Sequence, residues 1–322
     1  MMRRKALAQA FAAVSFAIGL LGGASAARAQ TAAEGVEVRF ELNDAQVKGR
    51  QLPGVLVRVS RVGGGSEVAS GQTGADGRWA TRLAPGTYEI SYRLAGYVPY
   101  TSEATEVRAD GQLVTVSLSR MLEATEAAGH DVRIILNWGS RPDQVRDADS
   151  HLACACGAPD RHVFYRSRSH LSQFHTAQLD VDDTDWGGPE TITLTKPPNG
   201  SYLYWVHDYS GPPAVLGISD LVVRVLIGSE QVGEFRVYRG LTRRAWRPFK
   251  AIEVAGEGRP TLVRFSEDEI AEGQDLAVPA DLQPPEPPAA SGTQSLACPL
   301  TALGLIVLMI WLGRRRRRRA GS

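Results

Sequence analysis

The sequence lacks the local motifs by which the common hydrolases are recognised. Its 322 residues contain no G-x-S-x-G segment, which would place a nucleophilic serine on a sharp turn, and no H-E-x-x-H zinc motif. The body of the chain also lacks the sustained 3.6-residue apolar spacing of a long amphipathic helix. These absences disfavour the serine hydrolases and the zinc proteases, and they favour strands over helices.

Turn-forming residues are plentiful instead. The chain has 33 glycines and 18 prolines, many of them in turn-like dipeptides between short apolar runs. We therefore expect an all-β fold, with two consecutive β-sandwich domains followed by a C-terminal transmembrane helix.

The N-terminal segment has the layout of a secretory signal peptide. Three basic residues (3–5) precede an Ala-rich apolar run (6–22), and the A-x-A sequence at residues 27–29 follows. We expect residues 1–29 to be removed by cleavage between Ala29 and Gln30. The body of the protein is then extracytoplasmic.

The C-terminal segment, residues 297–319, predicts a membrane helix with a basic tail. Residues 297–313 carry no charge, and at roughly 1.5 Å per residue they span about 25 Å, slightly less than a hydrocarbon core. Six arginines (314–319) follow, and such a basic flank stays on the cytoplasmic side. Residues 267–296, which are acidic and then Pro-rich, are expected to be an extended linker that holds the body off the membrane.

The same segment resembles the short C-terminal sorting signals of bacteria, in particular the MYXO-CTERM type. The matching features are Cys298, the short apolar helix and the terminal arginine cluster. The resemblance implies that the helix is removed by a membrane protease and that Cys298 becomes the lipidated end. In this sequence Ala297 stands where such signals usually have glycine.

The chain without its two basic ends has a negative net charge. The whole chain has a formal net charge of +1, but ten of its 36 basic residues lie in residues 1–29 and 314–319, which contain no acidic residue. The remainder has 26 basic and 35 acidic residues, a net charge of −9. An acidic secreted body disfavours nucleic acid as a partner and leaves an envelope protein or a glycan as the expected ligand.

Cysteine is scarce, with three residues in all. Cys154 and Cys156 form a C-x-C pair, for which a disulfide, free thiols and pairing with another chain are the alternatives outside the cytoplasm. A zinc site formed by His151, Cys154, Cys156 and His162 is a further interpretation. It lacks the paired C-x2-C spacing of structural zinc sites.

Residues 35–121 predict the first sandwich. Short alternating strands are separated by turn signals such as Ala84-Pro85-Gly86, at intervals of about 8–12 residues. The segment "TGADGRWATRLAPGTYEISYRLAGYVPYT" (73–101) resembles the carboxypeptidase-regulatory-like, transthyretin-like family. That resemblance implies a β-sandwich and a non-catalytic spacer or binding platform.

Residues 131–265 predict the second sandwich and carry the residues of chemical interest. "RDADSHL" places Asp147, Asp149 and His151 at alternate positions, and "LDVDDTDWGGPE" (179–190) is strongly acidic. On one strand Asp180 and Asp182 would share a face, where their repulsion would be offset by a cation. The candidate Ca²⁺ ligands are Asp149, Asp180, Asp182, Asp183, Asp185 and Glu190. The alternative is a solvated acidic loop.

The segments "LNWGSRPDQVRDADSHL", "HVFY", "LDVDDTDWGGPETITL" and "YWVHDYS" are similar to the YfaP-like family of bacterial secreted proteins. That resemblance implies a fold and no mechanism. Ala148 departs from the leucine of the family pattern.

The functional prediction is a non-catalytic, membrane-anchored envelope or cell-surface protein with a spacer, adhesion or ligand-binding role that depends on Ca²⁺. The alternative is a hydrolase that acts on cell-wall or extracellular polymer through Asp149, His151 and Asp182. His207, beside an aromatic strand, is interpreted as a packed or hydrogen-bonded residue.

Overall fold

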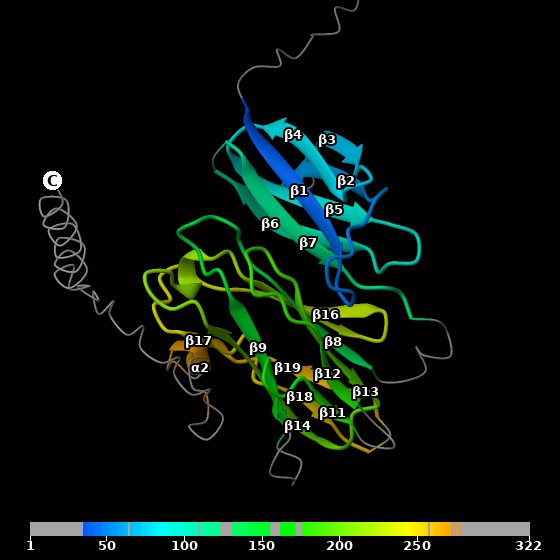
Figure 1. Ribbon diagram of the computed structural model, residues 1–322, viewed down its shortest axis with the longest axis vertical. Coiled ribbons are helices and arrows are strands. Elements are labelled where there is room, and N and C mark those ends of the chain that lie inside the picture. Colours follow the sequence, from blue (N-terminus) through cyan, green and yellow to red (C-terminus); the bar gives the residue numbers. More distant parts are fainter. Residues whose placement is uncertain are drawn as a thin grey trace, which may run out of the picture.

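The computed structural model describes residues 35–63, 65–108, 110–122, 131–154, 162–171, 176–256 and 258–271, together with residues 273, 275 and 278. These residues form two stacked groups of β-sheets, of which the N-terminal group is blue to cyan in Figure 1. The helices in this part of the chain are short: η1 (Leu216–Ile218) and α2 (Glu267–Ala271). The predicted all-β fold class is confirmed.

The N-terminal group is a sandwich of a three-stranded and a four-stranded sheet. Its strand order is β4-β1-β7 in one sheet, where β1 and β7 are parallel, and β3-β2-β5-β6 in the other. The strands are β1 (Val36–Asp44), β2 (Leu56–Arg61), β3 (Glu67–Gln72), β4 (Arg78–Leu83), β5 (Gly86–Arg93), β6 (Tyr100–Val107) and β7 (Gln112–Leu118).

Alternation of apolar side chains builds the core of this sandwich. Val38, Phe40 and Leu42 of β1 are fully buried and pack with Ile90 and Tyr92 of β5 in the facing sheet. Side chains that alternate across a strand place every second residue on the inner face. The period-two pattern of the sequence therefore locates this core.

The C-terminal group is a sandwich of two six-stranded sheets. One sheet has the order β11-β12-β13-β8-β15-β16, and the other has the order β10-β9-β14-β18-β19, with β17 paired to β14. The strands are β8 (Val132–Asn137), β9 (Ala148–Cys154), β10 (His162–Val163), β11 (Ser169–Leu171), β12 (Thr176–Val181), β13 (Glu190–Thr195), β14 (Gly200–Asp208), β15 (Val222–Ile227), β16 (Glu230–Arg236), β17 (Ala245–Trp246), β18 (Ala251–Val254) and β19 (Thr261–Val263).

Strand β8 is buried along its whole length, and it is central in its sheet as its apolar run predicts. Ile134 and Leu136 point into the main core of the C-terminal sandwich, whereas Ile135 packs with Ala45 and Val98 of the N-terminal sandwich. The two faces of one strand thus meet two different cores. This double burial explains why three consecutive residues of the strand, Ile134, Ile135 and Leu136, are apolar.

Buried polar contacts fasten the two sandwiches together. Arg133 of β8 donates hydrogen bonds to Ser119 Oγ at 2.6 Å and to the carbonyl oxygen of Arg120 at 2.5 Å. Arg224 of β15 donates to the carbonyl oxygen of Ser117, and its guanidinium lies 4.1 Å from the centroid of the Tyr100 ring. The N-terminal sandwich therefore covers the outer face of the β8–β15 sheet.

No helix within the described ranges is both long and apolar enough to cross a membrane. The predicted signal peptide (1–29), most of the predicted linker (267–296) and the predicted membrane helix with its arginine tail (297–319) lie outside those ranges.

Candidate metal centre

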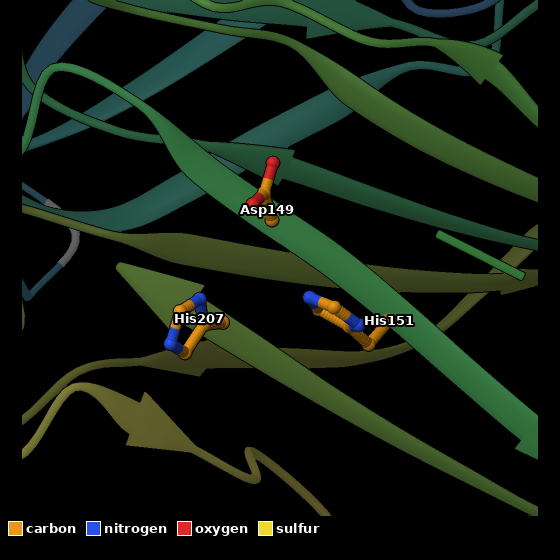
Figure 2. Close-up of side chains that lie close together, drawn as sticks. All are labelled: Asp149, His151 and His207. Carbon is orange, nitrogen blue, oxygen red and sulfur yellow. The ribbon is translucent and has the colours of Figure 1, made fainter. Parts of the chain in front are cut away.

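The centre is built on two neighbouring strands, β9 and β14. They pair antiparallel in a register that sets Asp149 opposite His207 and His151 opposite Trp205. Residues opposite each other, and residues two apart on one strand, share a face of the sheet. Asp149, His151 and His207 therefore lie together, as Figure 2 shows.

Two further carboxylates approach Asp149 from the other sheet. Asp182 directly follows β12, and Glu190 begins β13. One oxygen each from Asp149, Asp182 and Glu190 lies within 4.8 Å of the other two. Oxygens that coordinate one Ca²⁺ at about 2.3–2.6 Å can be up to about 5 Å apart, so this spacing suits a shared ion.

Each of these carboxylates has an oxygen without a hydrogen-bond partner among the described residues, and two of the three side chains are buried. Asp182 is half-buried, and its other oxygen, Oδ2, lies 3.4 Å from Arg168 Nη1. Glu190 is fully buried and Asp149 is 3% exposed. Oδ2 of Asp149, Oδ1 of Asp182 and Oε1 of Glu190 have no hydrogen-bond partner among the described residues, and neither has Oδ1 of Asp147. A buried carboxylate without partners is costly unless a cation compensates its charge.

Burial and mutual repulsion raise the pKa values of Asp149 and Glu190. Burial, with the nearby Asp147, Asp182 and Asp208, raises the pKa of Asp149 to about 8. Burial, with Asp149 and Asp182, raises the pKa of Glu190 well above its usual value. Both shifts favour the protonated forms of Asp149 and Glu190 when no cation is bound, and a bound divalent cation would replace those protons.

The loop before Glu190 sets the position of its side chain. Glu190 Oε2 accepts a hydrogen bond from the backbone N–H of Ser150 on β9, which ties the two sheets together at the centre. Gly187 and Gly188 precede it with φ angles of +100° and +69°. A Cβ on Gly188 would lie 2.7 Å from the Trp138 ring. Only glycine fits this turn without strain.

Replacement of Gly188 by alanine is expected to lower the free energy of unfolding by more than the roughly 1–3 kcal/mol that a strained left-handed residue costs, because the new Cβ also clashes with the Trp138 ring. Gly256→Ala is the matched control, because Gly256 has a φ of +61° and a Cβ added there would meet nothing within 4 Å. Chemical denaturation of both variants checks the prediction. Equal losses would contradict the steric role of Gly188.

The two histidines of the centre also have ring nitrogens without hydrogen-bond partners among the described residues. One atom each of Asp149, His151 and His207 lies within 4.8 Å of the other two. Nε2 of His151 and Nδ1 of His207 have no hydrogen-bond partner in the described part of the chain. Burial lowers the pKa of His207 to about 4 and that of His151 well below its usual value, so both rings are neutral.

The structure brings Asp149, Asp182 and Glu190 together but places the other candidate ligands elsewhere. Asp180 accepts a hydrogen bond from Thr193 Oγ1 at 2.5 Å, Asp183 Oδ1 accepts one from the backbone N–H of Asp185, and Asp185 pairs with Arg146 at 2.8 Å. The expectation that Asp180 and Asp182 share a strand face is corrected. The register shifts between Leu179 and Val181, and β12 ends before Asp182.

His207 was missed as a candidate ligand. The sequence places Asp149 and His151 two residues apart, but only the β9–β14 register adds His207.

Cys154 is disulfide-bonded, which removes the thiolate that the alternative zinc site needs. Cys156 and Cys298 lie outside the described residues, as do Ala29 and Gln30.

Comparisons with known proteins identify part of the chain. Residues 42–119 match the model of the carboxypeptidase regulatory-like domain. No curated protein matches the chain significantly in sequence.

Solved structures with a similar arrangement are distant. The Bacillus anthracis TIE protein is 14% identical, with a TM-score of 0.24, over 65% of this chain and 33% of that chain. Fervidolysin from Fervidobacterium pennivorans, a keratinolytic enzyme related to subtilisin, is 14% identical, with a TM-score of 0.23, over 71% and 33% of the two chains. The major pilin subunit of Bacillus cereus is 10% identical, with a TM-score of 0.23, over 72% and 96%.

The chain thus spans about a third of the length of the first two of these proteins. Structural similarity at TM-scores this low is no basis for assigning a function to the chain. What the comparisons support is confined to the N-terminal sandwich, where residues 42–119 match the carboxypeptidase regulatory-like domain.

Proposed function

We propose that the protein is a non-catalytic envelope or cell-surface binding protein whose C-terminal sandwich is stabilised by Ca²⁺. The observation that carries the proposal is the convergence of Asp149, Asp182 and Glu190, whose oxygens lie within 4.8 Å of one another and include buried atoms without partners in the described structure. The N-terminal sandwich serves as the spacer or platform.

The chemistry of these three ligands favours Ca²⁺ among divalent cations. All three offer carboxylate oxygens, and hard oxygen ligands select Ca²⁺, Mg²⁺ or Mn²⁺. They come from the ends of three different strands and loops, an irregular arrangement that suits the flexible shell of Ca²⁺ better than the strict octahedron of Mg²⁺.

Burial supports a structural role over the hydrolase alternative. Asp149 belongs to both clusters, so one of its oxygens lies within 4.8 Å of a ligand atom of His151 and one lies within 4.8 Å of an oxygen of Asp182. His151 is fully buried, however, and lies under stacked rings of Phe164 and Trp205. A polymer chain has no open path to a general base that is enclosed in this way.

Calcium binding is tested most simply by titration calorimetry of the full chain after removal of metals with EDTA. We expect one Ca²⁺ per chain, and no binding at that stoichiometry in Glu190→Gln. Absence of a binding isotherm in the wild type would refute the Ca²⁺-dependent function.

The proposed location is extracytoplasmic and membrane-anchored, with the arginine tail cytoplasmic before any processing. It is supported by the signal-like residues 1–29, the apolar segment 297–313 and Cys298. The proposed partners are the membrane, through the C-terminal segment, and an envelope protein or glycan.

Intact mass of the membrane-extracted protein checks this location. We expect a mass that begins at Gln30. If the sorting signal is processed, we also expect loss of the residues after Cys298 and a lipid on its sulfur. A full-length mass that retains residues 1–29 would contradict secretion.

A further inference from the structure

We propose that the centre has a second metal position, formed by Asp149, His151 and His207, that takes a borderline transition-metal ion of the Zn²⁺ class. This position goes beyond the proposed Ca²⁺ site, with which it shares only Asp149. Two imidazoles and one carboxylate are the ligand set that such ions prefer, whereas Ca²⁺ prefers oxygen alone.

The three ligands are buried and preorganised by strand pairing. Asp149 is 3% exposed, His151 is fully buried and His207 is 8% exposed. Asp149 and His207 face each other in the β9–β14 register, and His151 lies two residues along β9 on the same face (Figure 2). Sites on paired strands hold their ligands more precisely than sites on loops.

Each ligand retains an atom for the ion. Oδ2 of Asp149, Nε2 of His151 and Nδ1 of His207 all lack hydrogen-bond partners within the described ranges. A histidine that serves only to fill a core normally satisfies its ring nitrogens. Three atoms without hydrogen-bond partners in one buried cluster indicate that the three side chains bind the same ion.

Contacts with His162 and Trp205 orient the His151 ring. Its Nδ1 lies 3.0 Å from His162 Nε2, and the ring stacks on Trp205 with centroids 5.0 Å apart. Metal-bound histidines commonly use their second ring nitrogen in this way, which fixes the tautomer and leaves the other nitrogen for the metal. His162 is therefore a positioning residue for the site.

Zinc titration of the full chain in saturating Ca²⁺ tests the proposal. We expect one tightly bound Zn²⁺ per chain, a loss of affinity of at least about 100-fold in His207→Ala, and a loss of about 10–100-fold in His162→Phe. Asp185→Asn is the matched control, because Asp185 is exposed and lies outside both ligand clusters, and it should keep the wild-type Zn²⁺ affinity. Unchanged Zn²⁺ affinity in His207→Ala would overturn the proposal.

Zinc X-ray absorption of the loaded wild-type protein gives a second readout that does not depend on a variant's folding. We expect nitrogen and oxygen neighbours at about 2.0–2.2 Å and outer-shell scattering from imidazole rings. An ion without imidazole neighbours, or no stoichiometric Zn²⁺, would refute the second position. Loss of Ca²⁺ binding with retained Zn²⁺ binding would refute only the proposed function.

Discussion

In saturating Ca²⁺ the protein is expected to melt about 5–10 °C higher than in EDTA. An ion present at about 100 times its dissociation constant stabilises the folded state by about 2.7 kcal/mol. For domains of this size, each kcal/mol raises the melting temperature by about 2–4 °C. Thermal melts of the full chain in the two conditions measure the shift.

Glu190→Gln is expected to abolish this shift. The amide cannot supply the negative charge that holds the ion, although its oxygen can still accept the hydrogen bond from the N–H of Ser150. In EDTA the variant should melt no lower than the wild type, because it removes a carboxyl group whose charge is disfavoured by burial and by Asp149.

The matched control is Asp185→Asn, which removes one negative charge from the same acidic loop. Asp185 is exposed, pairs with Arg146 and lies outside both ligand clusters. It should retain the full Ca²⁺ shift. A shift that is equally lost in both variants would mean that general charge, and not coordination at Glu190, attracts the ion.

Arg133→Ala is expected to lower the free energy of unfolding by about 3–5 kcal/mol, because each buried acceptor that loses its donor costs about 1–3 kcal/mol. Arg133 is 1% exposed and donates to Ser119 Oγ, the carbonyl oxygen of Arg120 and the carbonyl oxygen of Gly228. Its loss removes a donor from two buried acceptors and from the part-buried carbonyl oxygen of Arg120, at the junction of the two sandwiches. Denaturant unfolding measures the effect.

The control for this junction is Arg259→Ala. Arg259 also bonds a carboxylate and a carbonyl oxygen, those of Glu230 and Ile227, but its side chain is 49% exposed. We expect a loss of about 1 kcal/mol or less, since exposed ion pairs contribute little. Similar losses in the two variants would show that the buried contacts at Arg133 do not hold the sandwiches together.

Much of the fold could be predicted because local patterns determine it. Period-two apolar spacing identifies β1 and its buried face, and the glycine-rich turns separate the strands. The short apolar run of β8 (134–136) correctly indicates a central strand. Its second source of burial, the N-terminal sandwich, is a tertiary contact that no local pattern encodes.

The candidate centre was only partly predictable for the same reason. Alternation within "DADSH" brings Asp149 and His151 onto one face, but the partner residue on β14 depends on the strand register. Spacing along the chain also grouped Asp180 with Asp182, whereas the irregular register of β12 and the end of that strand separate them. Long-range pairing, and not composition, selects the ligands.

The most direct test of the central claim is anomalous scattering from crystals of the Ca²⁺-loaded protein. The proposed centre predicts one strong peak about 2.3–2.6 Å from carboxylate oxygens of Asp149, Asp182 and Glu190. A well-ordered structure in saturating Ca²⁺ that has no peak between these three side chains would contradict it.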